Sequence, residues 1–120
     1  MSFEEEVHAF FSRLSQRPAA SRWLPKYACL AQVSSAEGDR AFVEIRQGDV
    51  RVRGQVEGKP DLYLRAERKL YQSIWSGETT AGEAWWKGEL ELGEPGQILD
   101  ASHSCYPWFT MLMRIAQGQR

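Results

Sequence analysis

The chain has 120 residues, of which 42% are hydrophobic and 26% are charged, and its formal net charge at pH 7 is -1. This length accommodates one hydrophobic core, so we expect a single domain over residues 1–120. The near-zero charge excludes the basic footprint of a nucleic-acid-binding protein, and no stretch approaches the roughly 20 apolar residues of a membrane-spanning helix.

The first predicted element is a helix over residues 2–16. Ser2 and Glu5 have the spacing of a capping box, in which each residue bonds the backbone N–H of the other. Apolar residues then recur on one helical face, namely Phe3, Val7, Phe10, Phe11 and Leu14. Pro18 is expected to end this helix.

A period of two between Tyr27 and Ala66 predicts an antiparallel meander of about four strands. The alternation is poor in the first strand and clear in the later ones, which we expect at 28–32, 43–46, 50–57 and 62–65. Arg51, Arg53 and Arg65 fall on the polar face of this sheet. We interpret them as a solvated surface, with a docking surface for an acidic partner as the alternative.

Two short helices and a strand follow. The first helix covers residues 70–77, with Gly77 as its C-cap. Thr80 and Glu83 again have capping-box spacing and open a helix that stops at Gly88. A short strand is expected at 90–92.

A helical run is predicted at 97–101, and the last helix is predicted to start at Pro107, a favoured first helical residue. Apolar residues cover most of its circumference: Trp108, Phe109, Met111, Leu112, Met113, Ile115 and Ala116. Such a helix must be covered on more than one side, by protein, by a second subunit or by a ligand.

This order of elements resembles the type-two sterol carrier protein family. The resemblance lies in Pro60-Asp61-Leu62-Tyr63-Leu64, in the helix from Leu70 to Gly77, and in Ala84-Trp85-Trp86-Lys87-Gly88-Glu89-Leu90-Glu91-Leu92-Gly93. It implies an α+β fold, with a five-stranded, mostly antiparallel sheet and helices packed on one face that enclose an apolar cavity. It also implies non-catalytic binding and carriage or presentation of a fatty acid, acyl chain, sterol or similar lipid, with no cofactor or metal.

If such a cavity exists, we expect an apolar lining from residues of the first helix, the two short helices and the last helix. The candidates are Phe10, Phe11, Trp75, Trp85, Trp108, Met111 and Leu112. Trp85 and Trp86 stand where smaller residues are common in that family, so they are expected to narrow or fill the cavity. The alternative is a solid core in a protein-interaction or dimerisation module; a homodimer and a transient membrane or enzyme partner are left open.

We do not expect an enzyme. His8 falls on the polar side of the first helix, and His103 and Cys105 are too close in sequence to form an oriented nucleophile–base pair. A third option is an enzyme of the ketosteroid-isomerase type, which needs a buried carboxylate with a tyrosine partner. Asp61 and Tyr63 fit that requirement poorly.

The sequence also predicts a cytoplasmic protein. The acidic N-terminal segment is unlike a signal peptide, and the chain does not end in the peroxisomal address Ser-Lys-Leu. Cys29 and Cys105 lack metal-ligand spacing, and we expect both to be thiols in a reducing compartment.

Overall fold

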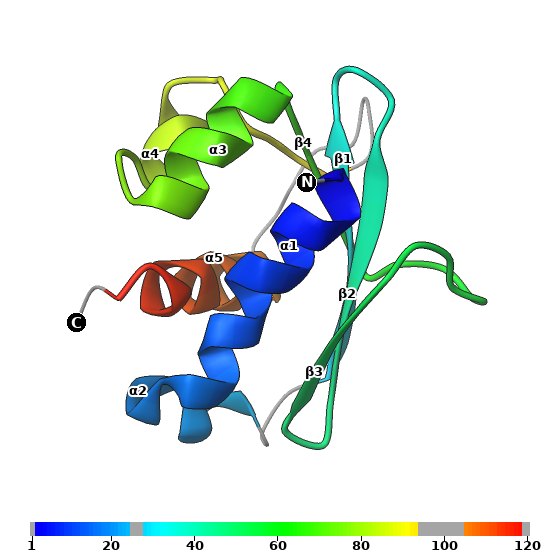
Figure 1. Cartoon of the computed structure of the whole chain (residues 1–120), viewed down its shortest axis with the longest axis vertical. Coiled ribbons are helices and arrows are strands. Elements are labelled where there is room, and N and C mark those ends of the chain that lie inside the picture. The colour runs from blue at the N-terminus through cyan, green and yellow to red at the C-terminus, as the bar shows by residue number, and fades with distance from the viewer. Residues whose placement is uncertain (1, 25–27, 94–104, 119–120) are drawn as a thin grey trace.

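A computed structural model describes residues 2–24, 28–93 and 105–118. A five-stranded sheet stands on one side and the helices lie on the other (Figure 1). The elements in chain order are α1 (Phe3–Phe11), the 3-10 helix η1 (Ser12–Gln16), α2 (Pro18–Ser21), β1 (Cys29–Ser35), β2 (Arg40–Arg46), β3 (Asp49–Arg53), β4 (Leu62–Ala66), α3 (Arg68–Ser76), α4 (Ala81–Trp86), β5 (Glu91–Leu92) and α5 (Cys105–Ala116).

The capping box at the start of α1 is confirmed. The Ser2 hydroxyl accepts the Glu5 N–H at 3.1 Å, and the Glu5 carboxylate accepts the Ser2 N–H at 3.2 Å. This bond from the Ser2 backbone lowers the pKa of Glu5. The α-helix is shorter than predicted, because the chain tightens into η1 before the extended Arg17 that precedes Pro18.

The sheet has the strand order β3-β2-β1-β4-β5, with β1 and β4 parallel and all other neighbours antiparallel. The prediction of a mostly antiparallel sheet is confirmed, but the prediction of a simple meander is wrong. Residues 54–61 leave β3 and cross the side of the sheet away from the helices to reach β4 (Figure 1). The Asp61 N–H donates to the Leu30 carbonyl oxygen at 2.7 Å, and the Leu30 N–H donates to the Asp61 carboxylate at 2.8 Å. These two bonds do not follow from local alternation, and they align β4 with β1.

Two strands also differ in detail from the prediction. In β1 the buried residues are Cys29, Ala31, Val33 and Ser35. The weak alternation at 28–32 suggests the other face of the strand, with Ala28, Leu30 and Gln32. The strand predicted at 50–57 ends at Arg53, because the chain turns there into the crossing to β4. The strands predicted at 43–46 and 62–65 are confirmed.

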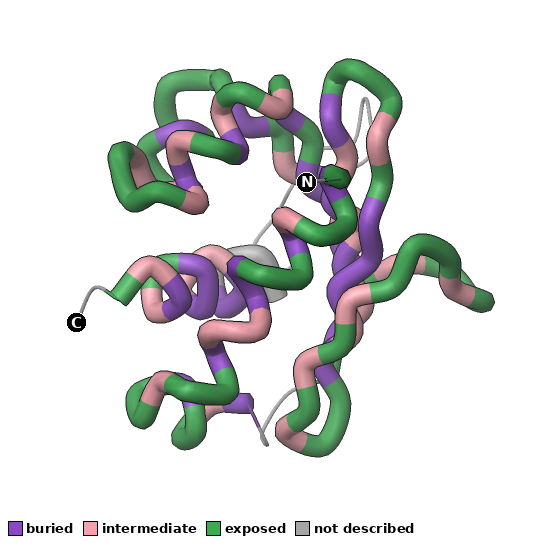
Figure 2. The backbone as a smooth tube through the Cα atoms, viewed as in Figure 1, coloured by how far each residue is buried: buried purple, intermediate pink, exposed green. Residues whose placement is uncertain are grey.

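The helices cover the inner face of the sheet, and the buried residues gather where the two layers meet (Figure 2). Arg68 at the start of α3 binds the Glu6 carboxylate of α1 through its Nε at 3.1 Å, and it lies 4.0 Å from Asp39 after β1. These ionic contacts raise the pKa of the Arg68 guanidinium, which stays charged. They fix the start of α3 on α1.

The predicted end of α3 at Gly77 and the predicted start of α4 after Thr80 are confirmed, and α4 ends at Trp86, slightly before the predicted Gly88. Gly77 adopts a φ of 86° as the C-cap of α3, and the Thr80 hydroxyl accepts the Glu83 N–H at 3.1 Å. The last helix begins at Cys105, two residues earlier than predicted. The helical run predicted at 97–101 lies outside the described residues.

Helix α5 is covered on several sides, as its composition requires. Its residues Trp108, Phe109, Leu112, Met113 and Ala116 are buried, and Arg114 is exposed. The α+β class and the helices on one face of the sheet are therefore confirmed, while the enclosed cavity stays a prediction.

Candidate functional site

Six aromatic side chains meet between α1, α3 and α5. They come from the apolar faces of the three helices, and each ring lies within 5.5 Å of another, centroid to centroid. We call this set the aromatic cluster: Phe3, Phe10, Phe11, Tyr71, Trp75 and Phe109. It joins segments that lie far apart in the sequence.

Trp75 is the centre of the aromatic cluster. Its ring stacks on Tyr71 with centroids 5.4 Å apart and 16° between the planes. It lies 4.5 Å from Phe10 on the other helix and 6.2 Å from Phe11, edge to face. These offset and edge-to-face arrangements are favourable for aromatic rings.

The two polar groups inside the aromatic cluster differ in their hydrogen bonds. The Tyr71 hydroxyl donates to the Ser34 carbonyl oxygen of β1 at 2.9 Å, and burial raises the pKa of this phenol. The indole Nε1–H of Trp75 is buried and has no hydrogen-bond partner in the described part of the chain. Since an indole nitrogen can only donate, an acceptor atom is what this position lacks.

Arg13 and Gln117 border Trp75. Arg13 donates to the Trp75 carbonyl oxygen at 3.3 Å, and its guanidinium carbon lies 5.4 Å from the centre of the Phe10 ring. The Gln117 side-chain amide donates to the carbonyl oxygens of Ile74 at 2.8 Å and Thr79 at 2.7 Å. The bonds of Gln117 tie the residue after α5 to the end of α3 and to the turn that follows it.

The structure brings together only some of the predicted lining residues. Phe10, Phe11 and Trp75 belong to the aromatic cluster, with both phenylalanines fully buried and Trp75 half-buried. On α5, Leu112 is fully buried, Trp108 is 8% exposed and Met111 is half-buried. Trp85 lies apart from them at the surface of α4, with 47% of its area exposed.

Sequence reasoning left Tyr71, Phe109 and Arg13 out of the candidate site. Tyr71 precedes Trp75 by four residues and Phe109 precedes Leu112 by three, so the spacing of a helical face already placed each beside a candidate. Arg13 follows Phe10 by three residues, which puts its guanidinium within reach of that ring. Spacing within one helix nevertheless does not show which side chains of α1, α3 and α5 contact one another, because those contacts depend on how the three helices pack.

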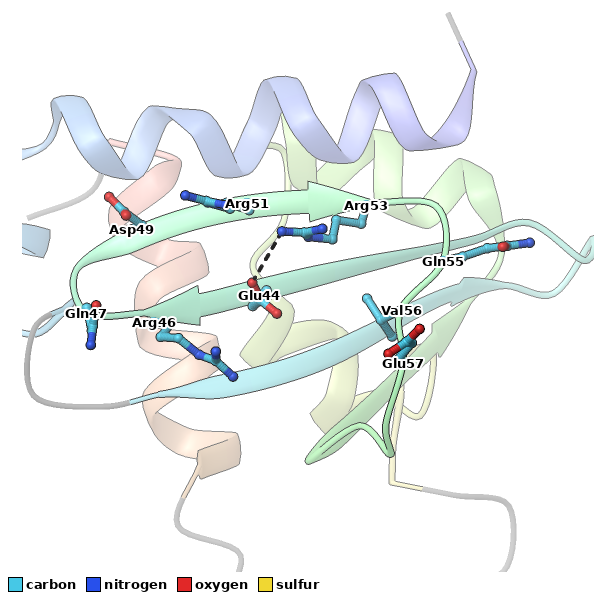
Figure 3. A pocket seen from close by; sticks show the side chains of 9 residues that line it. All are labelled: Glu44, Arg46, Gln47, Asp49, Arg51, Arg53, Gln55, Val56 and Glu57. Carbon is cyan, nitrogen blue, oxygen red and sulfur yellow. Dashed lines mark ion pairs between the residues drawn. The ribbon is translucent and has the colours of Figure 1, made fainter.

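The outer face of the sheet carries a shallow polar hollow between β2, β3 and the crossing segment (Figure 3). Arg53 pairs with Glu44 of the neighbouring strand at 3.8 Å. The basic residues of the hollow, Arg46, Arg51 and Arg53, are matched by the acidic Glu44, Asp49 and Glu57. This balance fits a solvated surface better than a docking site for an acidic partner.

The described residues contain no group of three or more His, Cys, Asp or Glu side chains that could hold a metal ion. None of the helices in the described ranges is long and apolar enough to cross a membrane. Cys29 is a buried thiol of β1.

No protein-family model and no curated protein matches the sequence. Among solved structures, sterol carrier protein 2 is similar over 97% of this chain and 96% of its own, with a TM-score of 0.69 and 16% identity. Palmitated SCP2L2 from Aedes aegypti gives a TM-score of 0.64 at 19% identity over 94% of this chain and 95% of its own. The ubiquinone synthesis protein UbiJ-SCP2 gives 0.67 at 15% identity, with 94% of each chain covered. The resemblance predicted from the sequence is thus confirmed in three dimensions: the chain has the fold of the sterol carrier protein 2 domain.

Proposed function

We propose that this protein binds a hydrophobic ligand that carries a hydrogen-bond acceptor, and that it carries or presents this ligand without catalysing a reaction. Fatty acids, acyl esters and sterols belong to this class. The fold supports the proposal, since a structure of the same fold is that of a palmitated protein. The lining that we propose keeps the predicted set: Phe10, Phe11, Trp75, Trp85, Trp108, Met111 and Leu112.

The observation that carries the proposal is the unpartnered indole N–H of Trp75. A buried donor without an acceptor costs about 1–3 kcal/mol, so a core with no other purpose would be more stable with an apolar ring there. A ligand oxygen that accepts this hydrogen bond removes the cost when the ligand binds. The surrounding rings of Phe10, Phe11 and Tyr71 then supply apolar contacts for the rest of the molecule.

The energetics allow binding without high specificity. Each buried methylene contributes roughly 0.8 kcal/mol, so an acyl chain of about 16 carbons gains roughly 13 kcal/mol before association costs. Association costs on the order of 4–15 kcal/mol, so a well-accommodated chain reaches micromolar affinity, about −8 kcal/mol, when this cost lies near the lower end of that range. Met111 suits such a lining because the methionine side chain is flexible and polarizable.

The test combines native mass spectrometry of the purified protein with calorimetric titration by palmitate and by cholesterol. We expect adducts of a few hundred daltons and saturable binding. Trp75→Phe removes the N–H but keeps an aromatic ring, so we expect about a tenfold weaker affinity for palmitate. Phe3→Leu, a change in the aromatic cluster outside the proposed lining that removes no hydrogen-bonding group, serves as the matched control and should leave the affinity for palmitate unchanged.

Three outcomes separate the parts of the proposal. A ligand-free mass, no response to any lipid and a concentration-independent dimer would replace it with the interaction module. Lipid binding that Trp75→Phe leaves unchanged would disprove the role of the indole N–H alone. Leu112→Glu and Trp85→Lys are each expected to reduce uptake, and normal uptake by a folded variant would remove that residue from the lining.

A further inference from the structure

Two adjacent tryptophans lie at the surface of α4. Trp86 is 84% exposed and Trp85 is 47% exposed, and they are the exposed large hydrophobic residues of the described part of the chain. The helix packs inward through Ala81 and Ala84, which are buried. We call Trp85 and Trp86 the tryptophan pair.

The residues around the tryptophan pair are small or charged. Gly82, Glu83, Lys87, Gly88 and Glu89 are all exposed, so they do not extend the apolar area. The two indoles together offer roughly 300 Å² of surface to a partner. A specific protein–protein interface needs about 800 Å² from each side, which this patch does not approach.

Attachment to a lipid bilayer requires less apolar area than a protein–protein interface does. Indole rings partition to the boundary between headgroups and acyl chains, because the ring is apolar and its N–H finds polar partners there. A small apolar anchor, such as a single acyl chain, gives weak and reversible attachment to a bilayer. Along the chain, the charges that flank the tryptophan pair are Glu83 and Glu89 against the single Lys87, so this segment does not itself attract anionic headgroups. Arg114 of α5 lines a hollow with Glu83, and the two charges offset each other.

We propose that the tryptophan pair docks the protein on the zwitterionic surface of a lipid bilayer. Both rings enter the interfacial region, and α4 lies against the headgroups. Docking itself needs no bound ligand. The role of docking rests on the proposed function. Because α4 follows α3 directly, attachment at Trp86 brings the aromatic cluster around Trp75 close to the bilayer, which is a source of lipid ligand.

The experiment measures co-sedimentation of the full chain with phosphatidylcholine vesicles. Trp86→Ser is expected to weaken vesicle partitioning about tenfold, and Trp85→Ser with Trp86→Ser to abolish it. Trp86→Tyr keeps an amphipathic ring and should restore most of the binding. Gln72→Ser, at an exposed position of α3, is the matched control and should bind as the unaltered protein does.

Two further measurements test the mode of attachment. Phosphatidylcholine brominated on its acyl chains should quench part of the tryptophan emission, and this quenching should fall in Trp86→Ser. Partitioning should hold when salt is raised to about 0.5 M, because surface electrostatics are screened there and indole insertion is not.

Binding that requires anionic lipid and disappears with salt would overturn the proposal, as would partitioning that Trp86→Ser leaves unchanged. A self-association that Trp86→Ser abolishes, in protein that ignores vesicles, would assign the tryptophan pair to a protein contact instead. Native mass spectrometry of Trp86→Ser separates the two proposals. If Trp86→Ser carries lipid adducts but does not bind vesicles, the ligand site is intact and only docking is lost. If the unaltered protein binds vesicles but takes up no lipid, the proposed function is refuted and the docking proposal stands.

Discussion

Helices α3 and α4 follow one another along the chain, and both carry tryptophan, but they use it in opposite ways. Trp75 of α3 lies in the aromatic cluster, against Phe10 and Tyr71. Trp85 and Trp86 of α4 lie at the surface, and alanines take the inward positions of that helix. The number of tryptophans therefore says little about the core, because the neighbours on the helical face decide which indole is buried.

The spacing of the residues explains the difference. In α3, Tyr71 and Trp75 are four residues apart, and Ile74 lies between them on the same side, so one face carries these large apolar side chains. In α4, Ala81 and Ala84 occupy that face. These small residues face the core, and the two indoles of α4 lie at its surface.

The largest predicted effect comes from removing the indole that α3 buries. Trp75→Ala should destabilise the protein by about 3 kcal/mol, because the cavity that it leaves lies between three rings. Urea unfolding monitored by circular dichroism measures this change. Trp75→Phe, which keeps most of the packing, should lose less than half as much. Equal losses of stability in the two variants would contradict this, because they would show that a ring at position 75 contributes nothing by filling the space between its neighbours.

A smaller effect is expected at the hydroxyl that α3 sends to the sheet. Tyr71→Phe removes the bond to the Ser34 carbonyl oxygen and should cost about 1 kcal/mol at neutral pH. The control is Phe3→Leu, which alters the neighbouring ring contact but no hydrogen bond.

The same hydroxyl sets a pH dependence. Burial raises the pKa of Tyr71 above the value near 10 of an unfolded tyrosine, so the folded state keeps a proton that the unfolded state loses. The stability that the neutral phenol confers is fully present below pH ~10 and is lost as the pH rises beyond it. Unfolding free energies measured from neutral to alkaline pH should fall less steeply in Tyr71→Phe than in the unaltered protein. Parallel pH profiles would contradict the burial of this group.

The cap of α4 tests whether that helix depends on local bonds. Thr80→Ala removes the acceptor of the Glu83 N–H and should destabilise the protein by about 1 kcal/mol. Thr80→Ser keeps the acceptor and should be nearly neutral. Hydrogen exchange of the Glu83 amide gives a local measure. If α4 were held by its alanine contacts alone, exchange at this amide would not accelerate.

The smallest effect is expected at the largest exposed side chain. Trp86→Ser should change the free energy of unfolding by no more than about 0.5 kcal/mol, since Trp86 contributes little to the packed interior. Urea unfolding of Trp86→Ser beside Trp75→Ala makes the contrast between the two helices direct. A loss comparable to that of Trp75→Ala would show that the surface of α4 is covered in solution.

The sequence alone determined much of the secondary structure and the class of fold. The caps at Ser2, Gly77 and Thr80, the apolar stripe of α1 and the alternation in β2 and β4 are local signals, and each appears where it was expected. The resemblance carried by residues 60–64 and 84–93 then led from a set of elements to the correct fold. Most candidate lining residues are also found in the interior, because they lie on the apolar faces of their helices.

Strand neighbours and the surroundings of each indole were decided only by the tertiary structure. Alternation tells which face of a strand is buried but not which strand lies beside it, so β4 pairing with β1 through Asp61 and Leu30 could not be derived from the sequence. In the same way, Trp75, Trp85 and Trp86 have identical side chains but differ in burial. Trp75 meets rings brought by α1, whereas Trp85 and Trp86 lie on a helix whose inward side is already filled by alanine, because packing between distant segments determines what each side chain meets.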